Sequence, residues 1–421
     1  MSVFDESLSR RSFAKTATAV SAGVMFGVPA SFSARAQDAT PVEAGGPGLP
    51  PPPEGSTVVA EGLLNPRFLA FGDDGTLYIT ENGYGGDEEL ALPEFGTGEL
   101  EATPATPGAD VVVAPEGTPV EAPPMPPSTR GYTGRISQVT ADGTQEVLVD
   151  GLASYSDGAG PNGIALGDGE IYFSIGGIAT GSGLEPLPEE NTVNRVVLET
   201  GAVELIAELG SYEVENNPDG TDVNPNLYMI ATSGDGQLLV ADAGANTVYT
   251  VDLASGEFEL TAVVPELPDL PGMEAAADAG QRQAVPTGVA VADDGTTYVG
   301  LLSEGWPEGA PSILTLAEDG TFEAASGPLG FNVGITVGPD GLVYASQLFT
   351  FTDASPEPGL GSVVRITADG EIEPVLEGVF MPHGIAFDAD GNMYVAINSL
   401  VSGPDMAGGQ VIRVDGVATS A

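Results

Sequence analysis

Apolar and polar residues alternate along this chain in short runs, and the runs come in pairs joined by a tight turn that contains Gly. In each of six similar pairs an apolar run leads into the turn, and the second run usually holds Tyr. The six pairs begin at Asn65, Gly160, Asn224, Val285, Phe331 and Met381. Alternation with a period of two predicts antiparallel strands, and a hairpin unit used this often is typical of a β-propeller.

A second pair of runs follows each of the first five hairpins, so that each unit predicts a blade of four short strands. The sixth hairpin is followed by one further run only, GGQVIRVDG from Gly408. The missing outer strand has a candidate in STVVAEGLL from Ser56, which matches the outermost runs of other blades. We predict an all-β, six-bladed β-propeller of four-stranded antiparallel blades over residues 57–416, closed by the N-terminal strand joining the last blade.

Insertions are confined to two types of connection, those between the second and third strands of a blade and those between blades. They are residues 84–133, 177–193, 210–224 and 265–285. These two connection types share one face of a propeller, which we expect to carry the binding site above the central channel. The long insertion in the first blade, 84–133, is rich in Pro, Ala and Glu and is predicted to be a flexible flap.

The first 36 residues read as an export signal. Arg10 and Arg11 form a twin-arginine motif, an apolar run follows, and Ala34-Arg35-Ala36 offers a cleavage site. We expect export by the twin-arginine route to an extracellular, periplasmic or cell-envelope location, with no stable membrane span after cleavage. The alternative is a retained membrane anchor, which Pro29 within the run disfavours. Residues 37–56 are predicted to be a disordered Pro/Gly-rich linker, and 417–421 a C-terminal tail.

The charge of the chain narrows the range of partners. The 421 residues carry a net charge of −50 and include no Cys, which excludes disulfides. Removing residues 1–36 takes away two acids and four basic groups, and leaves 59 acids, seven Arg and a net charge of −52. Such a surface disfavours nucleic acid and anionic membranes as partners. It suits a monomer in a salty exterior, or one that attracts divalent cations.

One residue lies at the start of each first strand, just after a Pro or Asn332, and is predicted to face the mouth of the channel. The six residues are Arg67, Asn162, Asn226, Thr287, Val333 and His383. Their polar members predict a site for a small anionic or polar ligand, unless they are polar only because they contact water. His383, the only histidine, is also a candidate general base. No nucleophile elbow, Ser-His-Asp spacing or phosphate-binding Gly loop accompanies it.

The connection after the second blade, SYEVENNPDGTDVNPN, is dense in oxygen ligands. Six to eight such ligands suit Ca²⁺, and the candidates are Asn217, Asp219, Asp222 and Asn224. Their spacing is not that of an EF-hand loop. The alternative is that Asn-Pro-Asp-Gly simply forms a turn.

The same connection carries the pattern ENNPDG followed by Asp222-x-Asn224-Pro225. Val285-Pro286-Thr287-Gly288, the later Gly305-x-Pro307, and the first hairpin from Gly62 form further matching stretches. These motifs resemble the ScyD/ScyE family of exported bacterial propellers, which are NHL-like, over residues 57–416. The chain departs from that pattern at Asn226-Leu227-Tyr228 and in the first-blade insertion. The resemblance implies a six-bladed fold and export, and no established catalysis.

A comparison with propellers of the gluconolactonase and regucalcin type disfavours that activity. Those enzymes hold a divalent cation in the channel with a Glu, Asn residues and an Asp, and only Asn162 fits that pattern in this chain, while Arg67 would repel the cation. We predict a propeller that binds a small ligand or an envelope partner on its loop-rich face. The alternatives are a lactonase-like or streptogramin-lyase-like enzyme, using His383 and Arg67 or a loop-bound Ca²⁺, and a purely structural envelope protein.

Overall fold

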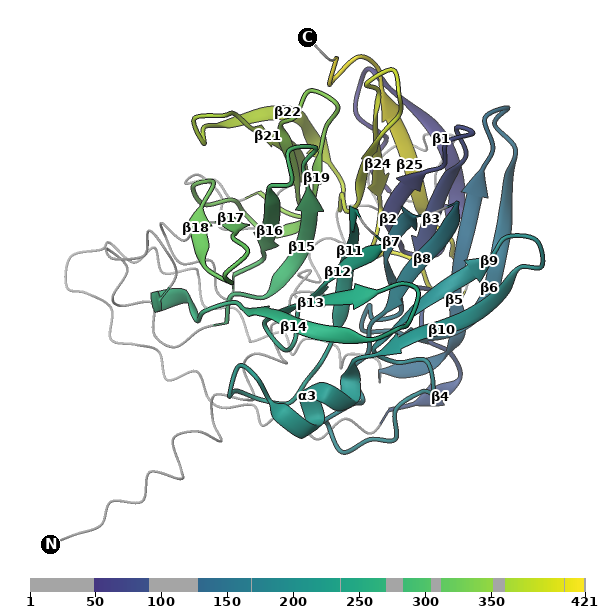
Figure 1. The fold of residues 1–421 in the computed structure, drawn as a ribbon. Helices are drawn as coiled ribbons and strands as arrows, with labels where there is room; N and C mark the ends of the chain where they lie inside the picture. The colour runs from purple at the N-terminus through teal and green to yellow at the C-terminus, as the bar shows by residue number, and fades with distance from the viewer. Residues whose placement is uncertain are drawn as a thin grey trace, which may run out of the picture.

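Six antiparallel sheets surround a common axis in the computed structural model, which describes residues 49–90, 128–269, 283–303, 312–350 and 360–419, except 168, 235 and 405 (Figure 1). The first strand of each sheet contacts the first strands of both neighbouring sheets, so the contacts close a ring. The predicted all-β six-bladed propeller is confirmed.

The strands of the first three blades follow chain order from the axis outward. The first blade holds β2 (Pro66–Phe71), β3 (Leu77–Glu81), β5 (Thr129–Val139) and β6 (Gln145–Tyr155), and the short β4 (Glu88–Glu89) pairs with the start of β5. The second holds β7 (Pro161–Gly167), β8 (Glu170–Ile175), β9 (Thr192–Val197) and β10 (Ala202–Glu208). The third holds β11 (Leu227–Gly234), β12 (Gln237–Asp242), β13 (Thr247–Asp252) and β14 (Phe258–Val263).

The remaining three blades are arranged in the same way, except that β1 supplies the outer strand of the sixth. The fourth holds β15 (Pro286–Val291), β16 (Thr297–Leu301), β17 (Ile313–Leu316) and β18 (Phe322–Ala324). The fifth holds β19 (Asn332–Val337), β20 (Val343–Gln347), β21 (Gly361–Ile366) and β22 (Ile372–Val379). The sixth holds β23 (Ile385–Phe387), β24 (Met393–Ile397), β25 (Gly409–Val414) and β1 (Ser56–Leu63).

The strand β1 closes the ring as predicted. It pairs antiparallel with β25, with Val58 opposite Ile412 and Ala60 opposite Val411. Ala60 and Val411 are buried in one hydrophobic cluster with Ile79 of the first blade. Because β1 is the outer strand of the last sheet, residues near the two ends of the described chain hold the ring together.

The middle strands are apolar on both faces because each blade packs between two others. In β12, Leu238 and Val240 join the core between the second and third blades. Their neighbours Leu239 and Ala241 join the core between the third and fourth blades. The outer strands β10 and β22 are mostly exposed or half-buried, with Ala207 buried in β10 and Leu376 and Val379 buried in β22. The polar alternation in the sequence therefore marks mainly the rim of the molecule.

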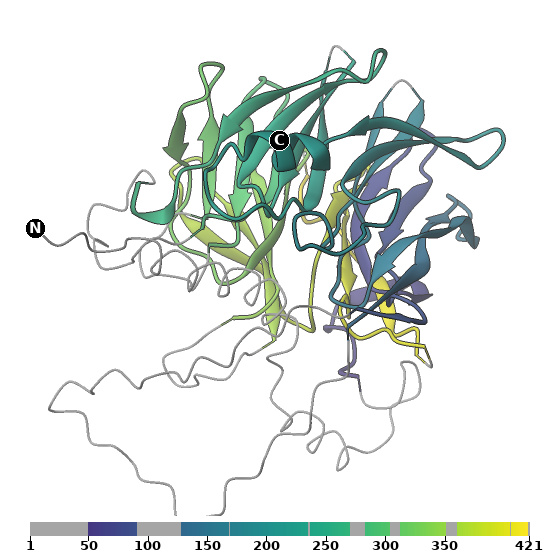
Figure 2. The same cartoon turned by 90° about the horizontal axis from the view of Figure 1, so that it is seen from below.

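The connection between the second and third blades contains a short helix, α3 (Gly210–Asn216), where we expected an irregular loop. Two views at right angles place it at the outer edge of the ring, beside the third blade (Figure 1, Figure 2). It ends at Asn217, which has a left-handed backbone (φ 40°) and donates its N–H to the carbonyl of Glu213. Tyr212 packs edge-on against Tyr249 and Phe258 of the third blade. The helix is thus held by tertiary contacts, since seven residues are too few for a stable isolated helix.

Several predicted segments lie outside the described residues. These are the export signal 1–36, residues 37–48 of the predicted linker and residues 91–127 of the predicted flap. A 3₁₀ turn, η2 (Leu267–Asp269), follows β14 and ends the described part of the connection between the third and fourth blades. Within the part of the chain that the structure describes, no helix is both long and apolar enough to cross a membrane.

Candidate functional site

A repeated backbone kink precedes five of the six residues that the sequence places at the first strands. Two positions before five of them, the chain has a positive φ: Asn65 (55°), Gly160 (150°), Val285 (55°), Phe331 (27°) and Met381 (47°). Side chains other than Gly and Asn rarely adopt a positive φ, and such strain persists only where the surrounding packing imposes it. Each kink is followed by the first strand of a blade, and these strands lie next to the axis (Figure 1).

Five of these six positions are buried rather than open to water, which corrects the expected channel mouth. Arg67 is 1% exposed, Asn162 and His383 are 0% exposed, and Thr287 and Val333 are also buried. Asn226 is half-buried. Contact with water therefore does not explain why the buried members are polar. These side chains lie at the centre of the ring, where neighbouring blades pack closely.

Three polar residues, Arg67, His383 and Tyr228, form a central cluster. The Nε2 atom of His383 lies 2.7 Å from the hydroxyl of Tyr228. The ring of Phe68 lies edge-on to both, with centroid distances of 4.9 Å to His383 and 5.6 Å to Tyr228. The backbone N–H of Gly384 donates to the carbonyl of Arg67 at 2.9 Å and so holds the first and last blades together.

The side chain of Arg67 is held by neutral groups. Its Nε donates to Oδ1 of Asn82, and its Nη2 donates to the carbonyl of Gly158 at 3.0 Å. Asn82 in turn donates to Oδ1 of Asn162 at 3.0 Å, and Asn162 donates to the carbonyl of Leu227 at 2.8 Å. A chain of amides therefore joins the first three blades and leads away from the guanidinium.

Arg67 has no carboxylate partner, which sets it apart from every other arginine in the described ranges. Five of these form ion pairs with Asp or Glu, namely Arg130, Arg135, Arg195, Arg365 and Arg413. Burial lowers the pKa of Arg67, and Tyr228 opposes this shift. Since a guanidinium stays protonated in proteins, the centre holds an unpaired positive charge within a chain of net charge −50.

The two other titratable groups of the central cluster are neutral at physiological pH. Burial first, and the charge of Arg67 second, hold the pKa of His383 well below its usual 6.5, while the backbone of Arg67 acts weakly in the opposite direction. Burial raises the pKa of Tyr228, against the effect of Arg67. Within the described ranges, Nδ1 of His383 has no hydrogen-bond partner. A neutral imidazole beside a phenol and a guanidinium can accept, donate or pass on a proton.

The other predicted ring residues lie apart from this cluster or beside it. Thr287 donates to the carbonyl of Asn332 at 2.8 Å and links the fourth blade to the fifth. The Oδ1 atom of Asn226 lacks a partner among the described residues. A Cβ on Gly176 would lie 2.3 Å from that oxygen and 2.6 Å from Nδ2 of Asn162, so both amides crowd the same glycine.

Sequence reasoning missed Tyr228 and Asn82, which the structure brings to Arg67 and His383. Tyr228 was visible only as a departure from the family pattern, at Asn226-Leu227-Tyr228. Asn82 follows the second strand of the first blade, where the pattern of apolar residues carries no signal for chemistry.

The four predicted calcium ligands make local hydrogen bonds. Asn217 donates to the carbonyl of Thr221 at 2.7 Å, and Asp219 accepts from the N–H and the hydroxyl of Thr221. With its amide oriented to satisfy both neighbours, Asn224 donates to the carbonyls of Asp222 at 2.7 Å and of Gly244 at 3.0 Å. No three His, Cys, Asp or Glu side chains in the described ranges lie close enough to share a metal ion. The bonds of Asn217 and Asp219 with Thr221 are those expected of a turn, and calcium binding by the four residues stays a prediction.

No protein-family model and no curated protein matches this sequence. The resemblance to the ScyD/ScyE family therefore stays a prediction. Among solved structures, a gluconolactonase from Xanthomonas campestris is 14% identical, with a TM-score of 0.48 over 89% of this chain and 99% of that chain.

Two further solved structures share the fold at similarly low sequence identity. A catalytically inactive virginiamycin B lyase from Staphylococcus aureus with quinupristin is 16% identical, with a TM-score of 0.44 over 85% of this chain and 97% of that chain. The calcium-binding protein regucalcin from Agrobacterium tumefaciens is 12% identical, with a TM-score of 0.48 over 87% of this chain and 95% of that chain. The chain is a six-bladed β-propeller that is structurally similar to gluconolactonase, virginiamycin B lyase and regucalcin, and this likeness concerns the fold alone.

Proposed function

We propose that this propeller binds a small anionic ligand at its centre, with Arg67 as the counter-ion. The observation that carries the proposal is the buried guanidinium of Arg67, which neutral groups hold and no carboxylate of the described chain neutralises. Burying a charge without a partner of opposite charge is costly, and removing one partner of a buried pair typically costs about 3–5 kcal/mol. A bound anion would remove that cost.

The chemistry around Arg67 favours a small carboxylate. Nε and Nη2 are engaged by Asn82 and Gly158, which leaves Nη1 without a hydrogen bond to any described residue. The N–H groups of Nη1 can bind a carboxylate oxygen through charge-assisted hydrogen bonds. Tyr228 and His383 add neutral polar groups that can orient a bound molecule without cancelling its charge.

The test is a binding screen with small mono- and dicarboxylates, phosphate and sulfate, followed by thermal unfolding and by NMR of the single histidine. We expect at least one carboxylate to raise the melting temperature and to shift the His383 signal. Arg67→Gln should lose this response, Arg67→Lys should keep part of it, and Arg195→Gln, on the surface, should keep all of it. If no anion acts beyond the effect of equal ionic strength, the proposal fails.

A second candidate function, a lyase or hydrolase, is favoured by the 2.7 Å contact between His383 and Tyr228. In such an enzyme the neutral imidazole would accept a proton, and Arg67 would stabilise a developing oxyanion. The measurement is turnover of a panel of lactones and cyclic esters by the wild type, His383→Asn and Tyr228→Phe. Absence of turnover by the wild type across the panel would leave binding as the function.

The proposal includes export, because residues 1–36 carry the twin-arginine motif. Replacing Arg10 and Arg11 by Lys should keep the protein inside the cell, which fractionation would detect. An envelope partner on the loop-rich face is the alternative to a small ligand, and crosslinking in the native host would reveal it.

A further inference from the structure

The helix α3 carries a carboxylate into the protein interior. The side chain of Glu213 is 0% exposed, and neither of its carboxylate oxygens has a hydrogen-bond partner among the described residues. Its neighbour on the helix, Glu215, is exposed. An unpartnered buried carboxylate is rare, because it loses its hydration and gains nothing in exchange.

A second buried carboxylate faces the same region from the end of β12. The Oδ1 atom of Asp242 accepts from the backbone N–H groups of Asn226, Gly244 and Ala245 at 2.7, 3.1 and 3.0 Å. Its other oxygen, Oδ2, has no partner in the described ranges, and the same holds for the hydroxyl of Thr247 at the start of β13. The hydrogen bonds to Oδ1 fix the orientation of Asp242, and Oδ2 is available to bind a ligand.

Asp242 and Thr247 lie opposite each other in the pairing of β12 with β13, and α3 packs on β13 through Tyr212 and Tyr249, so these groups lie in one neighbourhood. Burial, then Asp242 and Asp219, raise the pKa of Glu213 to about 8. Burial is also the main cause that raises the pKa of Asp242 to about 6, and Asp219 adds to it. The described arginines are engaged elsewhere, so no positive side chain of the described protein neutralises this cluster.

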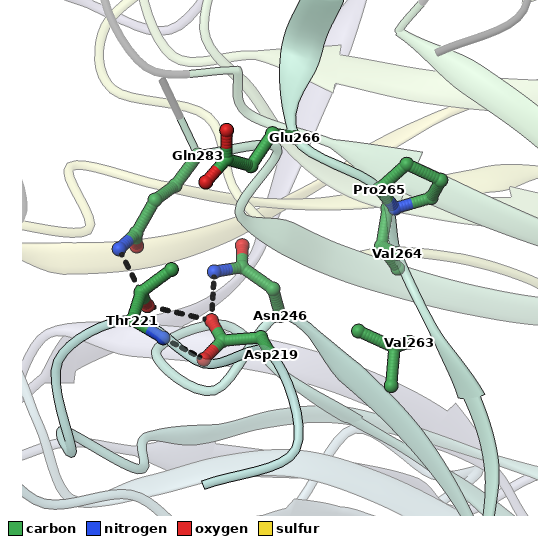
Figure 3. A pocket seen from close by; sticks show the side chains of 8 residues that line it. All are labelled: Asp219, Thr221, Asn246, Val263, Val264, Pro265, Glu266 and Gln283. Atoms are coloured by element: carbon green, nitrogen blue, oxygen red, sulfur yellow. Dashed lines mark hydrogen bonds between the residues drawn. The ribbon is translucent and has the colours of Figure 1, made fainter. Parts of the chain in front are cut away.

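A cavity lies beside Asp219, the residue whose charge helps to raise the pKa of both buried carboxylates. It measures about 100 Å³ and is lined by Asp219, Thr221, Asn246, Val263, Val264, Pro265, Glu266 and Gln283 (Figure 3). Figure 3 shows Asp219 hydrogen-bonded to Thr221 and Asn246 at one wall, with Glu266 and Gln283 along another. A volume of this size can hold water molecules, which would offer further oxygen ligands.

We propose that a divalent cation of the Ca²⁺ type binds between α3 and the third blade, with Glu213 and Oδ2 of Asp242 as its charged ligands. Thr247 and waters from the cavity would supply neutral oxygens. A site made of oxygens alone, without His or Cys, selects a hard cation. No three His, Cys, Asp or Glu side chains of the described ranges could hold a metal together, so the proposed site combines two carboxylates with neutral oxygens. These ligands differ from the four that the sequence predicts, and the site is separate from the anion site at Arg67.

The experiment is a calcium titration of chelator-treated protein in about 0.15 M salt, where the binding of ions to exposed acids is screened. We expect a rise in melting temperature that saturates with Ca²⁺ and that excess chelator reverses. We also expect one equivalent of Tb³⁺, a calcium substitute, to emit on excitation of Tyr212 and Tyr249, which pack beside Glu213.

The matched variants are Glu213→Gln and Glu215→Gln, which each replace one carboxyl group of the same helix by an amide. Glu213→Gln should abolish the calcium shift and the Tb³⁺ emission, and Glu215→Gln should preserve both. Without calcium, Glu213→Gln should melt at a higher temperature than the wild type. A buried carboxyl must either carry a charge in the interior or keep its proton, whereas a buried amide is uncharged. This control shows that loss of binding is not loss of folding.

Two results would overturn the proposal. One is a wild-type protein whose melting temperature does not respond to Ca²⁺ and that binds no stoichiometric Tb³⁺. The other is a response that survives in Glu213→Gln but disappears in the double variant Asp219→Ala, Asp222→Ala. That second pattern would assign the cation to the ligands predicted from the sequence.

Discussion

The regions around Arg67 and Glu213 carry opposite charges, and in neither does the described protein supply a counter-ion. Glu81 shows the usual arrangement. It is also 0% exposed, but Arg135 donates to its Oε2 at 2.8 Å and Ser137 donates to its other oxygen. At Glu81, therefore, a buried carboxylate with a structural role has a partner of opposite charge. The two unpaired regions are where we infer that ligands of opposite charge bind.

Removing the ion pair between Glu81 and Arg135 should have the largest effect on stability. Glu81→Ala removes the partner of Arg135 and an acceptor of the Leu64 N–H, next to the strand that closes the ring. We expect the free energy of unfolding to fall by about 3 kcal/mol, as for a broken buried pair. Denaturant unfolding measures this fall. A loss below about 1 kcal/mol would show that the pair contributes no more than a surface one.

Replacing Arg67 should come next, with an effect on binding rather than on closure of the ring. A hydrogen bond to a charged group contributes about 1.5–3 kcal/mol, so Arg67→Gln should weaken binding of the best carboxylate about 10- to 100-fold. Isothermal titration calorimetry measures the change. Equal affinity of the variant and the wild type would show that the charge of Arg67 does not contribute to ligand binding.

A double variant sharpens the comparison, because the two unpaired regions should act independently. Arg67 lies at the axis and Glu213 on the connection between the second and third blades, and the two share no partner among the described residues. The effects of Arg67→Gln and Glu213→Gln on the free energy of unfolding should add to within about 0.5 kcal/mol. A larger coupling, measured by a double-mutant cycle, would mean that the two regions form one site.

The smallest expected effect is that His383 does not titrate in the pH range of an exposed histidine. His383 has a folded-state pKa well below 6.5, so it is neutral when folded, and its proton uptake on unfolding lowers stability as the pH falls through 6.5. Because it is the only histidine, its ring signals are unambiguous in NMR. They should not move between about pH 7.5 and pH 5.5, across the range where an exposed histidine titrates. A shift with a midpoint near 6.5 would show that water reaches the centre.

The predicted fold was accurate because a propeller is built from local units. Each hairpin carries its own apolar runs and turn, and the closing strand was recognisable because β1 repeats the pattern of other outer strands. The helix α3 was missed, because its seven residues depend on contacts of Tyr212 with Tyr249 and Phe258. Those contacts join segments that the sequence does not place side by side.

The sequence by itself determined the number of blades, the closure of the ring and the positions nearest the axis, since period-two alternation and turns are properties of neighbouring residues. Only the tertiary structure decided that these positions are buried, that Tyr228 reaches His383, and that Arg67 and Glu213 lack counter-ions among the described residues. Burial and charge pairing depend on which side chains meet across different blades. That meeting is decided by the packing of the whole ring, which no single stretch of sequence encodes.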